Sequence, residues 1–303
     1  MIRLALLQTR WLGDVDAMRR QYLSMAANAA AAGASIIGLP EFSLNPYFAV
    51  TRDPVGFDWA EPLPGGASER FFAGLSRDLN VVVLGSLYER TADGHYYDTA
   101  TVHERGALVG VTRKVHIPSG DGYHETAFFG GADEYPIHTA GGLRIAAPTC
   151  YDQWFPELAR IVTLKGAQLI FYPTAIGSEP NDPAMDSRDA WQRVMQGHAV
   201  ANGVFVAACN RVGSEGSNTF YGSSFVCDPS GAILAQAGRE SVEIILADLD
   251  LDVQRKWREF FPLLHQRRPG IYADLLQPWS ADDKPAWLID AQRNRWQPPD
   301  PAR

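Results

Sequence analysis

Four reactive side chains, a thiol, an ammonium and two carboxylates, lie at the ends of predicted strands or in a nearby loop. Cys150 follows the apolar segment 143–149 and precedes a short polar loop and Pro156, which suits the start of a helix. Such a junction can expose a thiol nucleophile beside free backbone N–H groups, and the helix dipole can favour its thiolate form. Glu41 could take a proton from this thiol, and Lys114 could stabilise a developing oxyanion.

The fourth side chain is Glu125, which lies in the loop 120–125, rich in glycine and aromatic residues. Three strand ends and one loop, each with one reactive group, are the arrangement that an active site at a sheet edge needs. Taken singly, each group has another interpretation: the cysteine as a small buried side chain, the glutamates and the lysine as solvated surface groups. The sequence therefore predicts an active site only if these residues meet.

An internal repeat indicates which elements position these residues. Segment 33–41 recurs as 166–174, and each reads as a helix that ends at glycine, an apolar strand and a stop at proline. Chance similarity of short apolar segments is the alternative, but further matches occur in the same order and favour duplication. They are 3–8 with 144–149, 80–84 with 202–206, and 105–109 with 230–234.

Four helices are predicted between these strands, because apolar residues recur at helical spacing. Asp14 is the expected N-cap of the first helix. The spacing is carried by Met18, Tyr22, Met25 and Ala29; by Phe71, Phe72, Leu75 and Leu79; by Leu158, Ile161, Val162 and Leu164; and by Trp191, Met195, His198 and Ala201. Each half then runs strand, helix, strand, helix and further strands, which predicts an α/β fold, a four-layer αββα sandwich with two similar halves.

Composition limits the class of protein. The 303 residues are 46% hydrophobic, which excludes disorder over most of the chain. Asp and Glu number 35 against 27 Lys and Arg, and the resulting charge of −8 argues against nucleic-acid binding. Three cysteines code for no disulfide framework, and Cys209 and Cys227 are interpreted as buried apolar residues. With no apolar run long enough to span a bilayer, we expect a cytoplasmic protein.

The last part of the chain differs in character. Residues 1–275 are predicted to form the catalytic domain, and residues 276–303 a C-terminal arm that holds Trp279, Trp287 and Trp296. These indole rings must cover an apolar surface. That surface could belong to the same subunit or to a neighbouring one.

Several motifs resemble those of the carbon–nitrogen hydrolase (nitrilase) superfamily, and within it the N-carbamoylputrescine amidase branch. The resemblance extends from residue 1 to about residue 275. Segments 39–42, 113–118 and 150–157 are similar to the superfamily motifs, and segments 171–180, 191–198 and 220–225 are similar to the branch. The resemblance implies an αββα fold, a covalent thiol mechanism and assembly into a dimer or larger homo-oligomer.

The resemblance also implies roles for the site residues. Cys150 matches the nucleophile, Glu41 the general base, and Lys114 the group that stabilises the oxyanion. Glu125 matches a second glutamate, which orients the lysine or assists proton transfer. The backbone N–H of Tyr151 would be a further oxyanion donor. No metal and no cofactor are expected, because this chemistry needs none.

The implied reaction is hydrolysis of N-carbamoylputrescine, a small carbamoyl amine, to putrescine, CO2 and ammonia. A buried ammonium needs a carboxylate partner, and Glu179 is the candidate; Tyr47 and Tyr151 would line a channel for the methylenes, and Thr174 is counted with the substrate-binding residues. The alternative is the same mechanism on an N-carbamoyl amino acid, an ω-amide or a nitrile. A carboxylate substrate should need a basic residue, and the loop after Cys150 has none. Rivals of other classes are a catalytically silent scaffold and a redox-sensing thiol.

Overall fold

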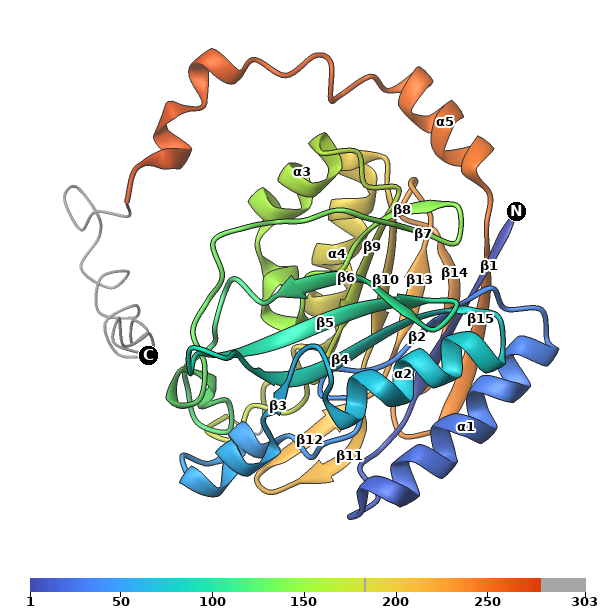
Figure 1. Ribbon diagram of the computed structural model, residues 1–303. Helices are drawn as coiled ribbons and strands as arrows, with labels where there is room; N and C mark the ends of the chain where they lie inside the picture. Colours follow the sequence, from blue (N-terminus) through green and yellow to red (C-terminus); the bar gives the residue numbers. More distant parts are fainter. Residues whose placement is uncertain (183, 279–303) are drawn as a thin grey trace.

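The computed structural model describes residues 1–182 and 184–278, whose strands form two large sheets and a hairpin (Figure 1). The first sheet contains β1 (Ile2–Gln8), β2 (Ile36–Gly38), β3 (Glu61–Pro62), β4 (Val82–Arg90), β5 (Tyr96–Glu104), β6 (Ala107–Arg113) and β15 (Glu243–Leu249). The second contains β7 (His138–Ala140), β8 (Leu143–Ala146), β9 (Leu169–Pro173), β10 (Phe205–Cys209), β13 (Phe225–Cys227) and β14 (Ile233–Gln236). The hairpin pairs β11 (Val212–Glu215) with β12 (Asn218–Tyr221).

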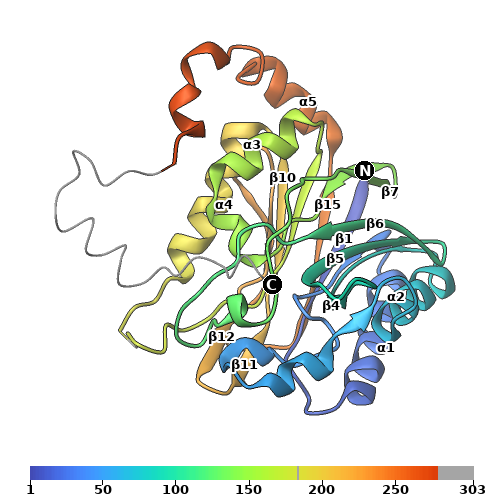
Figure 2. The same cartoon turned by 60° about the vertical axis from the view of Figure 1, so that its left-hand side comes forward.

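The helices cover the outer faces of the two sheets (Figures 1 and 2). On the first sheet lie α1 (Val15–Ala31) and α2 (Ala67–Asp78), and on the second lie α3 (Pro156–Leu164) and α4 (Arg188–Asn202). The chain continues into α5 (Leu251–Phe260). Short 3₁₀ helices are η1 (Phe48–Val50), η2 (Pro54–Trp59), η3 (Glu125–Ala127), η4 (Cys150–Trp154), η5 (Pro269–Ile271) and η6 (Ala273–Leu276).

The central core lies between the two sheets, where side chains such as Leu6 of β1 and Phe171 of β9 are fully buried in one cluster. Gly38, at the end of β2, shows how closely the sheets approach. A Cβ atom at this position would lie 2.4 Å from Cε2 of Phe171 and 2.9 Å from Cδ2 of Leu6. Glycine is therefore required here by the contact between the sheets.

The predicted repeat is confirmed by the order of the strands. The first sheet runs β15-β1-β2-β4-β5-β6, and the second, read in the same sense, runs β7-β8-β9-β10-β13-β14. Three neighbouring strands are parallel in each sheet: β1, β2 and β4 in the first, and β8, β9 and β10 in the second. Antiparallel strands flank them on both sides. The predicted four-layer αββα sandwich with two similar halves is the observed fold.

The predicted helices also form, and most of their apolar faces are buried. The Asp14 side chain accepts a hydrogen bond from Ala17 N at 2.8 Å, so Asp14 caps α1 as expected. Gly166 lies just beyond the end of α3 with a φ of 96°, which suits a glycine that stops a helix. Two assignments were wrong. Leu164, the last residue of α3, is 46% exposed. Ala201 is exposed because Ala199 and Asn202 occupy the buried face at the end of α4.

The segment from α5 onward runs along the outside of the molecule (Figure 1, orange to red). Its apolar side chains are unusually exposed, with Phe260 at 78% and Leu276 at 84%. Most of the predicted arm, including Trp279, Trp287 and Trp296, lies outside the described residues. Across residues 1–182 and 184–278, no helix has the length and apolar character needed to cross a membrane.

Candidate active site

The candidate residues meet because strands that run in one direction end at a common edge. Glu41 follows β2, and Cys150 follows β8, each just beyond the carboxyl end of a central parallel strand. Lys114 follows β6, which runs in the same direction as β4 because β5 is antiparallel to both. Glu125 begins η3 in the loop that follows. The two halves of the sandwich therefore contribute to one site.

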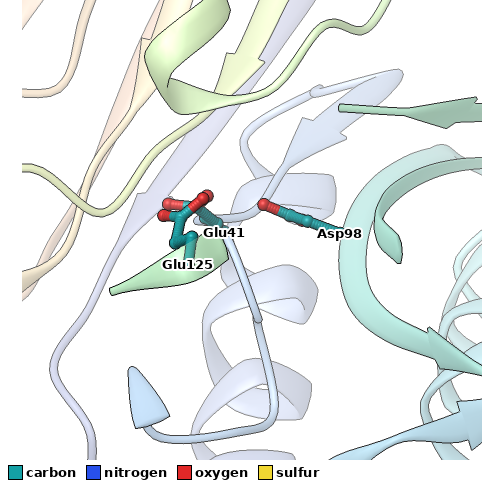
Figure 3. A group of neighbouring side chains, drawn as sticks. All are labelled: Glu41, Asp98 and Glu125. Atoms are coloured by element: carbon teal, nitrogen blue, oxygen red, sulfur yellow. The ribbon is translucent and has the colours of Figure 1, made fainter. Parts of the chain in front are cut away.

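Lys114 is the centre of this site. Its side chain is fully buried, and Nζ donates to Glu41 Oε1 at 2.8 Å and to Glu125 Oε2 at 2.5 Å. A third carboxylate, Asp98 of β5, places Oδ2 3.3 Å from the same nitrogen. Figure 3 shows the carboxylates of Glu41 and Glu125 side by side and that of Asp98 directed toward them. One ammonium thus faces three carboxylates with no exposure to solvent.

These three carboxylates also have the spacing of a cation site. In the part of the chain that the structure describes, Glu41, Asp98 and Glu125 offer ligand atoms within 4.8 Å of one another. Nζ of Lys114 lies within 3.3 Å of one oxygen of each. The ammonium therefore occupies the position at which a metal ion would contact all three, and the cluster is a lysine site.

Burial and crowding decide the protonation of the cluster. Burial raises the pKa of Glu125 to about 7, although the Lys114 ammonium opposes this shift. Burial, together with the neighbouring Glu41, raises the pKa of Asp98 well above its usual range. Burial alone would lower the pKa of Lys114, but attraction by the surrounding carboxylates raises it well above its usual value. These directions favour the charged form of the lysine and the neutral form of Asp98.

Cys150 occupies a strained position at the start of η4. Its φ of 40° lies in the left-handed region, which a residue with a Cβ adopts only when its surroundings enforce it. Burial raises the pKa of the Cys150 thiol well above its usual value, and Glu41 adds to this, while Lys114 and a backbone hydrogen bond with Ala175 oppose it. The expected thiolate is therefore not favoured: desolvation outweighs the dipole of a helix only one turn long.

Asp152 ties the nucleophile to the lysine. It accepts a hydrogen bond from Thr149 N at 3.1 Å within the η4 turn and another from His116 N at 2.9 Å in the segment after β6. The His116 ring lies 2.8 Å from the same carboxylate and stacks on Phe155, with ring centroids 3.6 Å apart. Asp152 is buried and joins the ends of two strands that belong to different sheets.

A cavity of about 730 Å³ opens onto these residues. Cys150 and Glu125 lie in its wall, whereas Glu41 and Lys114 are fully buried behind them. Besides Glu125, four Asp, Glu or Arg side chains line the cavity together with the predicted Tyr151. They are Arg52, Asp121, Glu179 and Asp182.

The structure places the predicted substrate-binding residues in two groups. Tyr151 and Glu179 line the cavity. Tyr47 and Thr174 are buried and are absent from the described residues that line it. The Tyr47 hydroxyl instead donates to Glu125 Oε1 at 2.6 Å, and the Thr174 hydroxyl donates to the carbonyl of Tyr172 at 3.0 Å. The prediction that Tyr47 lines a channel is therefore corrected, and so is the placement of Thr174 among the substrate-binding residues: both side chains are buried behind the cavity wall.

Sequence reasoning missed Asp98 and Arg52. Asp98 had a signal, since it is the one acidic residue inside the strand segment 96–103, and such a residue must be paired when buried. Arg52 had none, because only the folded chain brings the segment after η1 to the cavity. Cys209 and Cys227 are fully buried, as interpreted.

A buried thiol, an ammonium and carboxylates at the shared edge of an αββα sandwich are the features of an enzyme that hydrolyses amide bonds. The family model for carbon-nitrogen hydrolases matches residues 3–259. The chain therefore belongs to the carbon-nitrogen hydrolase family, and it is an amide-hydrolysing enzyme.

The chain is also similar to individual enzymes and solved structures of this family. The chain is 40% identical over 253 residues to an N-carbamoylputrescine amidase from Solanum lycopersicum, covering 80% of this chain and 84% of the relative. It is 38% identical over 261 residues to a citrullinase from Francisella tularensis, covering 84% and 91%. A crystal structure of a carbon-nitrogen hydrolase from Helicobacter pylori G27 superimposes with a TM-score of 0.84 at 33% identity, covering 92% of this chain and 99% of that one.

Proposed function

We propose that the protein hydrolyses N-carbamoylputrescine to putrescine, CO2 and ammonia through a covalent intermediate on Cys150. The observation that carries the proposal is the Lys114 ammonium, which donates to Glu41 and Glu125 behind the cavity wall that contains Cys150 and Glu125. Glu179 in the same cavity supplies a negative charge for an amine. The similarity to the tomato amidase supports the choice of substrate.

In the first half of the reaction, the sulfur of Cys150 attacks the carbamoyl carbon while Glu41 takes the thiol proton. A resting thiol suits this step, because a raised pKa requires a base at the moment of attack. Lys114 and the Tyr151 N–H hold the negative oxygen, and one such donor contributes about 3–4 kcal/mol in comparable sites. The C–N bond to the terminal nitrogen then breaks, and Glu41 gives its proton to the departing ammonia.

In the second half, water attacks the carbamoyl thioester. Glu41 takes a proton from this water, the C–S bond breaks, and the proton passes to the sulfur of Cys150. The product is a carbamate, which releases CO2 to leave putrescine. Glu41 thus accepts and returns a proton in each half, and its carboxylate must stay within reach of both the sulfur and the water.

Recognition of the substrate's amine is assigned to Glu179. The segment before it is fixed by Tyr123, whose hydroxyl accepts from Gly177 N at 3.0 Å and donates to the Ser178 carbonyl at 3.1 Å. A charge-assisted contact contributes about 1.5–3 kcal/mol. Glu179→Gln should therefore lower kcat/KM for N-carbamoylputrescine about 10- to 150-fold, with little change for a neutral carbamoyl amine. Equal losses on both substrates would remove this role.

The substrate itself is tested by a screen of ammonia release. Purified protein is incubated with N-carbamoylputrescine, citrulline, an ω-amide and a nitrile, and kcat/KM is compared. The proposal expects N-carbamoylputrescine to be the best of these. A preference of about tenfold or more for the ω-amide or the nitrile would contradict it.

A second candidate substrate is citrulline, and Arg52 is the observation that favours it. Citrulline differs from N-carbamoylputrescine by one carboxylate, on the carbon that bears the distal amine. Glu179 could hold the amine of either molecule, and Arg52, which lines the same cavity, could pair with the additional carboxylate. The argument from sequence against a carboxylate substrate considered only the loop after Cys150, whereas this cation comes from a distant segment.

Arg52→Met separates the two substrates. If Arg52 binds a carboxylate, the variant should lose about 10- to 150-fold in kcat/KM for citrulline and little for N-carbamoylputrescine. Arg10→Met is a control on another arginine that is absent from the described lining of the cavity. Unchanged citrulline kinetics in Arg52→Met would eliminate this second candidate.

We also propose a homo-oligomer in which a second copy covers the segment from α5 onward, and a boundary at residue 275 between the catalytic domain and the arm. The exposed apolar side chains of this segment support both ideas; they include Phe260, Phe261, Ile271, Leu275 and Leu276. Sedimentation of the full chain and of a variant that ends at residue 275 tests them. A monomeric full chain would exclude the oligomer, and loss of folding in the shortened chain would exclude the boundary.

A cytoplasmic location is proposed as well. All three cysteines are free thiols, which suits a reducing compartment. Cell fractionation followed by immunodetection of the protein tests this location. Recovery in a membrane or secreted fraction would contradict it.

A further inference from the structure

A buried ion pair lies behind the site, and the mechanism above does not use it. Arg211, two residues beyond β10, places Nη1 2.6 Å from Oε1 of Glu215. The two side chains are only 3% and 8% exposed. Burying two long charged side chains costs free energy. We therefore expect this pair to have a role beyond the mutual neutralisation of its two charges.

The guanidinium of Arg211 holds the turn that carries Glu41. It donates to the carbonyl of Glu41 from Nε at 3.1 Å and from Nη2 at 3.0 Å. Nη2 also donates to the carbonyls of Phe42 at 2.6 Å and Asn45 at 2.5 Å. Phe42 has a left-handed φ of 45°, so this turn is a conformation that its surroundings must enforce.

Glu215 extends the same connection to the second glutamate. Its Oε2 accepts a hydrogen bond from Tyr47 N at 2.7 Å. The hydroxyl of Tyr47 in turn donates to Glu125 Oε1 at 2.6 Å. Arg211 therefore reaches Glu41 through backbone carbonyls, and Glu215 reaches Glu125 through a single tyrosine.

We propose that Arg211 and Glu215 are positioning residues that set where Glu41 and Glu125 stand around Lys114. Arginine suits the task because its planar group presents five donors in a fixed geometry, which a lysine ammonium does not. The pair belongs to the second half of the chain, and Glu41 belongs to the first. The inference rests on the proposed roles of Glu41 and Glu125.

The test is Arg211→Lys, which keeps the charge beside Glu215 but gives up most bonds to the Glu41 turn. A displacement of about 1 Å at a reacting group costs about 100-fold in rate. We expect kcat to fall between about 10- and 100-fold, with KM within about twofold of wild type, because the cavity wall that binds substrate is unchanged.

Arg258→Lys is the matched control. Arg258 also uses its guanidinium to hold backbone carbonyls, of Gly203 at 2.7 Å and Ala167 at 3.1 Å. These carbonyls precede β10 and β9, at the end of the sheet opposite the site. Arg258→Lys should lower the melting temperature and leave kcat as it is. If both variants lose kcat in proportion to their loss of melting temperature, Arg211 is only structural and the proposal is overturned.

A readout that needs no substrate separates this inference from the proposed function. The rate of alkylation of Cys150 by iodoacetamide is measured against pH. Glu41 raises the pKa of the Cys150 thiol, so a displaced Glu41 should move the apparent pKa of alkylation downward in Arg211→Lys and not in Arg258→Lys. If the wild type releases no ammonia from any compound, the proposed function fails, and these profiles still decide the positioning role. Identical profiles would overturn it.

Should Arg211→Lys fail to fold, Glu215→Gln is measured in the same two ways. The amide of this variant offers one oxygen where the carboxylate uses two, so it loses its bond either to Arg211 or to Tyr47 N. The expected result is a kcat lowered about tenfold with KM nearly constant. A wild-type kcat in Glu215→Gln would overturn the proposal.

Discussion

Glu125→Gln should flatten the dependence of stability on pH. Burial raises the pKa of Glu125 from an ordinary 4.5 to about 7. Between these values the folded state holds a proton that the unfolded chain has released, so the free energy of unfolding falls as pH rises. The difference corresponds to about 3 kcal/mol, fully present below about pH 4.5 and lost as pH rises through about 7.

Urea denaturation, followed by circular dichroism from about pH 5 to about pH 8.5, measures this dependence. The wild type should lose about 3 kcal/mol over the range through this residue, and Glu125→Gln should lose much less. Tyr47→Phe should instead change the pH at which the stability falls. Its hydroxyl stabilises the charged form of Glu125, so without it the fall in stability should move to higher pH.

The comparison has a clear failing result. If Glu125→Gln retains the wild-type decrease in stability between about pH 5 and about pH 8.5, the buried carboxylate is not its source. The same holds if Tyr47→Phe moves the decrease to lower pH. Either result would mean that Glu125 does not titrate in the way that its burial indicates.

Four further variants test the site. Cys150→Ala should abolish ammonia release and Cys209→Ala should not, since the second thiol is enclosed in the core between the sheets; ammonia release by Cys150→Ala would end the thiol mechanism. Burial raises the pKa of Asp98 well above its usual range and favours its neutral form, so Asp98→Asn should stay within about tenfold of wild-type kcat; a much larger loss would show that its charge is needed. Asp152→Ala frees Thr149 N and His116 N, and kcat should fall about 10- to 100-fold; an unchanged kcat in a folded variant would remove its linking role.

Much of the fold could be predicted from the sequence because its two halves repeat the same signals. Glycine after a helix and proline after a strand mark the same boundaries in 33–41 and in 166–174, and the structure places β2 and β9 there. The end of α4 was less predictable. The buried face continues from His198 by four residues to Asn202, whereas a step of three had been expected and pointed to Ala201.

The reactive residues of the site were predicted mainly from their positions at strand ends. Cys150, Glu41 and Lys114 each follow a strand, and strands of one direction share an edge. Tyr47 was misplaced because sequence does not tell which way a loop side chain points. Arg211 was missed because its importance comes from contacts with carbonyls 166 to 170 positions away, which no local pattern encodes.

The close approach of the two sheets at Gly38 has a consequence for catalysis. Glu41 stands three residues beyond that glycine on one sheet, and Cys150 follows a strand of the other. The thickness of the hydrophobic core between the two sheets thus sets the distance from the Cys150 sulfur to the Glu41 carboxylate. Enlarging an interior side chain there, such as by Gly38→Ala against Phe171, would spread the reacting atoms although no substrate touches it. Screens for inactive variants should consequently recover hits deep within the sandwich, far from any solvent-filled space.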